Sequence, residues 1–234
     1  MDKNFPLPIK NFPSGYPWYK RLGSNITYLV SQIPLSKRGN KLSSYDITTI
    51  WQKIRTGDIL LVGNFHHASG IFIDGIVTHA IAYVGKGRCI HAFAHGVSYI
   101  GLRKVCRMYD TLVILRPRWQ SEEQLQKYRN NLIAKIGQPY DFFFGLEEKT
   151  EDVYFCTRLI NESLLSSGYS SGLDSIRNPE NILDITLDET FRAHRALLPE
   201  DMLYGNFDVT FYSHNITKEG EKYILPEGKI EFLT

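Results

Sequence analysis

A run of strand-like segments between residues 59 and 115, with no helical pattern among them, most limits what this chain can fold into. Ile59-Leu60-Leu61-Val62 is apolar on both faces, which is typical of a central strand. The other segments span residues 77–84, 89–94, 96–105 and 111–115. Gly85-Lys86-Gly87 is typical of a tight turn between two of them. We therefore predict an antiparallel sheet and an α+β fold class rather than a βαβ fold.

Helical patterns flank these strands along the chain. Asp46 is predicted to cap a short helix over 46–54, and Ser121 to cap a longer one over 122–136. A third helix is predicted to begin just before Cys156 and to end near residue 168, with apolar residues at helical spacing. The later predicted elements are helices at 188–197 and 199–204, a strand at 207–212 and a terminal hairpin over 223–233.

The length of 234 residues fits a single domain over 1–234. We divide it into an irregular N-terminal wrap (1–44), a catalytic core (45–165) and a C-terminal part of helices and strands (166–234). Five prolines interrupt the first of these parts. The aromatic side chains at Tyr16, Trp18 and Tyr19 predict that it packs onto the body of the protein.

Charge and cysteine usage bound the function class and the compartment. The formal net charge of +2 gives no reason to expect a nucleic-acid partner. Three cysteines at scattered positions form no disulfide framework, which suits a reducing compartment. No apolar signal segment and no run of ~18 apolar residues is found. We therefore expect a cytoplasmic protein without a transmembrane segment, and leave leaderless export open.

Cys156 is the candidate nucleophile, because it lies just inside the predicted start of a helix. Glu151 and Asp152 precede it and are predicted to cap that start. Free N–H groups and the partial positive charge of a helix N-terminus favour a thiolate and can bind an oxyanion. The alternative is that Cys156 is a small buried apolar residue, as most free cysteines are.

His79 and His91 are the candidate partners of this thiol. If Val84 pairs with Arg88 across a three-residue turn, the two histidines lie on the same face and within reach of each other. Such a pair can act as base and orienting group, or as two ligands of a metal. A metal site would need further ligands from His66, His67, His95 or Cys156, but no tight ligand pair of zinc spacing occurs, so we predict none.

Two aromatic stretches near these residues have open roles. Tyr140 precedes the cysteine by a short interval, and its phenol can donate to an oxyanion. Asp141 is expected to brace the turn, while the phenylalanines at 142–144 fit core packing equally well. The loop over 63–75 contains Phe65, Ile71, Phe72 and Ile73, and either lines an apolar acyl pocket or covers the core.

Short motifs of the chain occur in a specific order. They are Arg55-Thr56-Gly57-Asp58-Ile59-Leu60-Leu61, Thr78-His79-Ala80, Tyr83-Val84-Gly85, His91-Ala92, Gly96-Val97, Leu115-Arg116-Pro117, Gly137-x-Pro139-Tyr140-Asp141-Phe142 and Tyr154-Phe155-Cys156-Thr157-Arg158-Leu159-Ile160. This order, from about residue 55 to residue 165, resembles the circularly permuted papain-like hydrolases of the NlpC-like superfamily, specifically the YiiX/YebB-like branch. In that family the histidine strand precedes the cysteine helix.

The resemblance implies an antiparallel sheet packed on the helix that carries the nucleophile. It implies Cys156 as nucleophile, His79 as base and His91 as the third polar group. Our own interpretation adds the Cys156 N–H and Tyr140 as the donors to the oxyanion. The branch has glutamate at the third position, and histidine there is similar to the lecithin–retinol acyltransferase relatives. We therefore predict a cysteine hydrolase, without a cofactor, that cleaves an acyl-amide, peptide or lipid-like substrate through a thioester. The alternatives are an acyltransferase or thioesterase on a lipid-like substrate, and a catalytically idle binding module.

Overall fold

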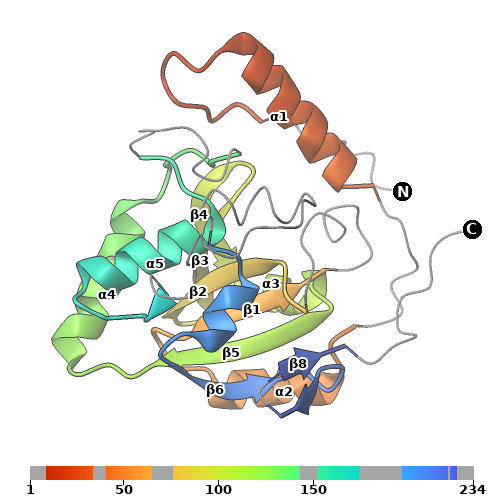
Figure 1. Cartoon of the computed structure of the whole chain (residues 1–234), viewed down its shortest axis with the longest axis vertical. Coiled ribbons are helices and arrows are strands. Elements are labelled where there is room, and N and C mark those ends of the chain that lie inside the picture. Colours follow the sequence, from red (N-terminus) through yellow and green to blue (C-terminus); the bar gives the residue numbers. More distant parts are fainter. Residues whose placement is uncertain are drawn as a thin grey trace, which may run out of the picture.

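Six antiparallel strands form the central sheet of the computed structural model, which describes residues 9–33, 41–64, 76–142, 152–173, 197–220 and 222–225. The strands are β1 (Ile59–Gly63), β2 (His79–Gly85), β3 (Arg88–Phe93), β4 (Gly96–Gly101), β5 (Thr111–Pro117) and β6 (Phe207–Tyr212). Their order is β4-β3-β2-β1-β5-β6 (Figure 1). Every neighbouring pair is antiparallel, and β1 is buried along its whole length. The prediction of an antiparallel α+β fold with a central β1 is confirmed.

Helices cover both faces of this sheet. One apolar cluster joins Ala80 and Ala82 of β2 to Leu159 of α5 (Cys156–Ser166) and to Leu132 of α4 (Glu122–Ala134). The other cluster joins the alternate residues of β2 to Ile50 of α2 (Ser44–Lys53) and to α3 (Leu102–Met108). Because successive side chains of a strand point to opposite faces, β2 contributes to both clusters. The helix that carries Cys156 thus packs directly on the strand that carries His79.

Two of the sequence motifs meet at one end of β1 and β5. The Asp58 carboxylate is buried and accepts two hydrogen bonds from the Arg116 guanidinium, from Nε and Nη2, both at 2.8 Å. The same guanidinium donates to the carbonyl oxygen of Lys53 at the end of α2. A bidentate pair of this kind fixes geometry as well as charge. It therefore ties the turn before β1 to the neighbouring strand and to the preceding helix.

The prediction that residues 1–44 are irregular is wrong for 18–31. Trp18–Ser31 is the helix α1, which lies apart from the other helices at the edge of the molecule (Figure 1). Pro17 is its N-cap residue, so this proline starts the helix and does not interrupt it. Trp18 and Tyr19 were expected to pack on the body, but both side chains are exposed.

Other predicted boundaries shift for local reasons. The strand expected over 96–105 ends at Gly101, after which α3 begins. Asp46 is the third residue of α2 and forms a reciprocal capping box with Ser43, which is the N-cap. The short hairpin pairs β7 (Thr217–Glu219) with β8 (Lys222–Ile224), so it begins before the predicted one, and Glu200–Tyr204 is a 3-10 helix. The helix predicted at 188–197 lies outside the described residues except for residue 197. The apolar loop residues of 65–75 lie wholly outside them.

The turn between β2 and β3 differs from the predicted one but keeps its consequence. Gly85 pairs with Arg88, so the turn has two residues, Lys86 and Gly87, both with positive φ as a type I′ turn requires. A two-residue turn alone would place His79 and His91 on opposite faces. A bulge between Tyr83 and Gly85 adds one residue to β2, and Tyr83 then pairs with Cys89. The bulge thus restores the predicted register.

We predict that Gly85→Ala destabilises the protein by roughly 1–3 kcal/mol, because Gly85 has φ +94° and an added Cβ would lie 2.8 Å from Thr56 Oγ1. Chemical denaturation measures the change. Gly101→Ala is the matched control, since Gly101 has φ −76° and open space around its Cα. A Gly85→Ala protein as stable as Gly101→Ala would contradict this account of the bulge.

Candidate active site

Cys156 is the first residue of α5, and its sulfur lies among backbone N–H groups. The residue before it, Phe155, is the N-cap and supplies no side-chain cap. Hydrogen bonding by the backbone N–H groups of Ala80 and Thr157 lowers the pKa of the Cys156 thiol. The predicted cap by Asp152 is wrong, since Asp152 is exposed in a turn with φ 65° before the helix, and Glu151 lies outside the described residues. The first turn of α5 therefore keeps its donors for the thiol or for a bound oxyanion.

His79 and His91 meet across the end of the β2–β3 hairpin. His79 Nε2 lies 3.1 Å from His91 Nδ1, and the two ring planes are nearly perpendicular. This confirms the predicted hydrogen bond between the two imidazoles. Residue pairing between the strands stops at Ala82 and Ile90, and the Ala80 N–H donates to the Cys156 sulfur. The thiol of α5 is thus joined to β2 at the residue that follows His79.

The hydrogen bond between the rings constrains their tautomers. His79 uses Nε2 toward His91, so Nδ1 is the ring nitrogen left to serve as a base. For Nδ1 to accept a proton, neutral His79 must carry its hydrogen on Nε2 and donate it to His91 Nδ1. His91 then carries its own hydrogen on Nε2. One tautomer assignment therefore satisfies both rings.

Aromatic rings hold both imidazoles in place. Tyr109 stacks on His79 with ring centroids 6.1 Å apart, and Phe93 stacks on His91 at 6.0 Å. Tyr109 is buried at the end of α3, and burial, followed by the charge of Cys156, raises the pKa of its phenol. Tyr109 was not among the predicted site residues, because an aromatic residue between a helix and a strand carries no sequence signal that separates site packing from core packing.

Tyr140 is placed beside the cysteine helix by a short parallel bridge. Tyr140 bridges to Tyr154, the Tyr154 N–H donates to Pro139 O at 3.0 Å, and the Asp141 N–H donates to Tyr154 O at 3.2 Å. Burial, followed by the charges of Cys156, Asp141 and Tyr109, raises the pKa of Tyr140 well above its usual value. The phenol therefore keeps its proton and can act as a hydrogen-bond donor.

Asp141 braces this segment, as predicted from the sequence. Its carboxylate is buried and lies 4.0 Å from Arg158 Nη1 in the first turn of α5. Arg158 also donates to Glu162 at 2.6 Å, and its guanidinium lies over the Tyr154 ring. On the other side of the helix start, the Thr157 hydroxyl donates to the Leu197 carbonyl oxygen. The position of Cys156 is thus fixed from two sides.

Burial governs the protonation of the site. It raises the pKa of the Cys156 thiol to about 11 and outweighs the backbone hydrogen bonds that lower it. Burial and the neighbouring His91 lower the pKa of His79 well below its ordinary value, while burial and Lys104 lower the pKa of His91 to about 4. At neutral pH the resting site therefore contains a neutral thiol and neutral imidazoles. The hydrogen bonds at the helix start do lower the thiol pKa, as expected, but burial outweighs them.

The other histidines do not join this site among the described residues. The exposed His95 is in contact with Tyr28 of α1, with His95 Nε2 3.5 Å from the phenol oxygen. His66 and His67 lie outside the described residues. In the part of the chain that the structure describes, no group of three or more metal-ligating side chains occurs, and no helix is long and apolar enough to cross a bilayer.

Comparison with known proteins identifies a family whose model matches most of this chain. The family model described as permuted papain-like amidase enzyme, YaeF/YiiX, C92 family, matches residues 53–204. The match spans every strand from β1 to β5, the helix α5 and both histidines. None of the curated proteins matches the chain.

We predict that the alkylation rate of Cys156 by iodoacetamide rises about tenfold per pH unit between pH 7 and 9.5, because only the thiolate reacts and the thiol pKa is about 11. Peptide mapping after timed labelling measures the rate at each cysteine. Cys89 and Cys106, whose pKa values burial raises to about 12 and about 11, are internal controls. A rate at Cys156 that is constant from pH 5 to 8 would show a preformed thiolate and refute this protonation state.

Proposed function

The chain belongs to the YaeF/YiiX (C92) family of permuted papain-like amidases, and on this premise we propose that it is a cysteine hydrolase that cleaves an amide or related acyl bond through a thioester acyl-enzyme. In this proposal Cys156 is the nucleophile, His79 is the general base and acid, and His91 orients His79. The observation that carries the proposal is the 3.1 Å bond between the imidazoles, next to the residue whose N–H binds the Cys156 sulfur.

The proposed first step transfers a proton as the carbon–sulfur bond forms. Since the thiol and His79 are both neutral at rest, the thiol proton moves to His79 Nδ1 while Sγ attacks the substrate carbonyl. The imidazolium then donates that proton to the leaving amine, which leaves the acyl group on Cys156 as a thioester. A water molecule, deprotonated by His79, attacks the thioester and releases the acid and the thiol.

The negative charge that develops on the carbonyl oxygen needs donors that are already in place. The N–H of Cys156 at the start of α5 is one proposed donor. The phenol of Tyr140 is the second, because its raised pKa keeps it protonated and the charge of Cys156 contributes to that rise. Each such donor is worth roughly 100- to 1,000-fold in turnover in enzymes of this kind. These donors matter more in this proposal, because the resting site contains no thiolate–imidazolium ion pair.

The second candidate function is acyl transfer or thioester hydrolysis on a lipid-like substrate. It is supported by one residue, His91, because histidine at this position is similar to the lecithin–retinol acyltransferase relatives. Acyltransferases and thioesterases that act on lipid-like substrates use the same kind of acyl-enzyme and differ in what resolves it. Because His91 is neutral, it accepts a hydrogen bond from protonated His79 but adds no negative charge to stabilise it. The chemistry of Cys156 is the same in both candidates, so the products of deacylation separate them.

We predict that acyl-amide, acyl-ester or isopeptide activity probes form one covalent adduct per chain, on Cys156. Intact mass spectrometry followed by peptide mapping measures it. Cys156→Ala should lose the adduct, and Cys89→Ala is the control that should keep it, because Cys89 lies in the opposite core cluster beside Tyr83. A folded wild-type protein that no probe class acylates would support the idle binding module. An adduct released faster by an alcohol or amine acceptor than by water would indicate acyl transfer.

We predict that His79→Ala lowers turnover by roughly 100- to 10,000-fold, the range of a lost general base, and that His91→Ala lowers it by less. Steady-state kinetics on the best probe amide measure both effects. His91→Glu adds a charge partner for protonated His79, so the acid limb of its pH–rate profile should move to higher pH. If His91→Ala matches wild type in turnover and in pH profile, the site is a Cys–His dyad without an orienting group.

A further inference from the structure

The helix α1 carries its apolar side chains on the surface. Seven large apolar residues of 18–33 are between 41% and 75% exposed. These residues are Trp18, Tyr19, Leu22, Ile26, Leu29, Val30 and Ile33. On a helix of 3.6 residues per turn they fall within about 120° of the circumference and form one continuous stripe. We call these seven residues the outer stripe.

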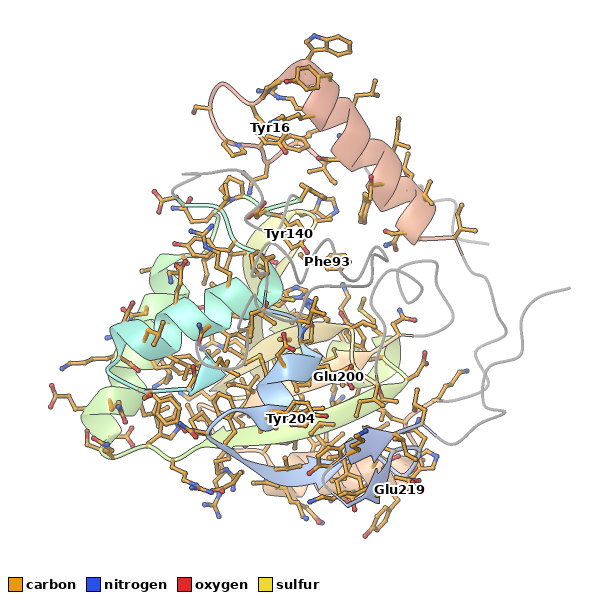
Figure 2. All side chains as sticks on the ribbon, in the orientation of Figure 1. Tyr16, Phe93, Tyr140, Glu200, Tyr204 and Glu219 are labelled. Carbon is orange, nitrogen blue, oxygen red and sulfur yellow. The ribbon has the colours of Figure 1, made fainter. Side chains whose placement is uncertain are left out.

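The opposite, more polar side of α1 faces the body of the protein. Its buried residues are Ser24 and Tyr28. Tyr28 packs edge-on against Phe93 at 6.4 Å, and Asn25 exchanges hydrogen bonds with the backbone of Ile9. The helix is therefore held in this orientation by specific contacts, with its apolar side turned away from the sheet (Figure 2). This is the reverse of an ordinary surface helix, which buries its apolar stripe.

The charge of the same segment differs from that of the rest of the chain. Residues 1–44 contain seven basic side chains and one acidic side chain, Asp2. The basic residues are Lys3, Lys10, Lys20, Arg21, Lys37, Arg38 and Lys41. The segment thus has a formal charge of +6 in a chain whose total is +2, so residues 45–234 carry a formal charge of −4. Lys20 and Arg21 lie on α1 itself.

We propose that the outer stripe of α1 docks on the surface of an anionic lipid bilayer. An amphipathic helix with aromatic and aliphatic residues on one side and basic residues around it lies in the plane of the membrane interface. Trp18 and Tyr19 have the side chains that concentrate at the headgroup level. The bilayer is favoured over a second copy of this chain, because two segments of charge +6 would repel each other, whereas anionic lipids attract them.

Docking of this kind brings the candidate active site close to the lipid surface. Tyr28 on the inner side of α1 contacts Phe93, and Phe93 stacks on His91. Figure 2 shows Phe93 and Tyr140 between α1 and the central sheet. On the docked protein the imidazoles therefore lie on the side of α1 away from the lipid. The diameter of that helix with side chains is about 10–12 Å. The docking proposal does not rest on the proposed chemistry, since it concerns residues that take no part in catalysis.

Vesicle binding by the full-length protein tests the proposal. Vesicles of phosphatidylcholine with 30% phosphatidylserine and vesicles of phosphatidylcholine alone are mixed with the protein at low salt and sedimented. We expect at least tenfold stronger partition to the anionic vesicles, which 0.5 M salt abolishes by screening. Tryptophan emission should shift to the blue on binding, and Trp18→Phe should lose most of that shift.

Two matched variants separate the outer stripe from general charge effects. Ile26→Glu places a charge in the stripe and should lower partition at least tenfold. Thr27→Glu adds the same charge at the next exposed position, outside the stripe, and should lower partition less than threefold. Circular dichroism and the Cys156 alkylation rate should be unchanged in both, which keeps folding and the site separate from docking.

Three results would overturn the proposal. The first is the absence of partition to anionic vesicles at low salt. The second is equal partition of Ile26→Glu and wild type. The third is a concentration-dependent dimer, measured by analytical ultracentrifugation, that Ile26→Glu dissolves while no vesicle binding occurs. That outcome would assign the outer stripe to self-association.

Discussion

The hydrogen bond between His79 and His91 depends on one additional residue in β2. The bulge between Tyr83 and Gly85 offsets the even length of the Lys86-Gly87 turn, so both histidines reach the same side of the hairpin. Without it, β3 would turn His91 into the opposite apolar layer. The bulge also precedes the point where residue pairing of β2 with β3 stops, and there the Ala80 N–H binds the sulfur of α5. Strand register thus decides whether the two imidazoles meet.

The same packing that aligns these groups also sets their charge. The thiol and both imidazoles are buried, so the charged form of each is disfavoured. In the proposed mechanism, a thiolate–imidazolium pair therefore arises during the reaction and not before it. The tautomers fixed by the ring–ring hydrogen bond leave Nδ1 of His79 as the proposed proton acceptor. Rigid aromatic contacts from Tyr109 and Phe93 limit the alternative ring orientations.

Sequence patterns predicted what depends on local chemistry. Alternation and turn residues located all six strands of the sheet, and the glycines at the turn indicated a hairpin that brings His79 and His91 to one face. These patterns could not give the number of residues in the turn. A bulge in β2 offsets a change of one residue in the turn, and the apolar alternation of the strands stays the same. The raised pKa of Cys156 was also missed, since burial depends on β2 and on residues distant in sequence. The helix α1 was not predicted, because the prolines of residues 1–44 indicate interrupted structure, whereas Pro17 begins a helix.

The neutral character of His91 has a consequence for how the site must stabilise its transition state. A carboxylate at this position would pair with the positive charge that forms on His79, whereas a neutral imidazole offers only a hydrogen-bond acceptor. In the proposed mechanism, the stabilisation then falls on the opposite charge, at the carbonyl oxygen. The uncapped N-terminus of α5 and the protonated phenol of Tyr140 are the proposed donors there, and the Asp141–Arg158 contact and the Tyr140–Tyr154 bridge fix their segments. Preorganised hydrogen-bond donors act most strongly where water is excluded. The burial that disfavours the thiolate therefore also strengthens the proposed donors to the carbonyl oxygen.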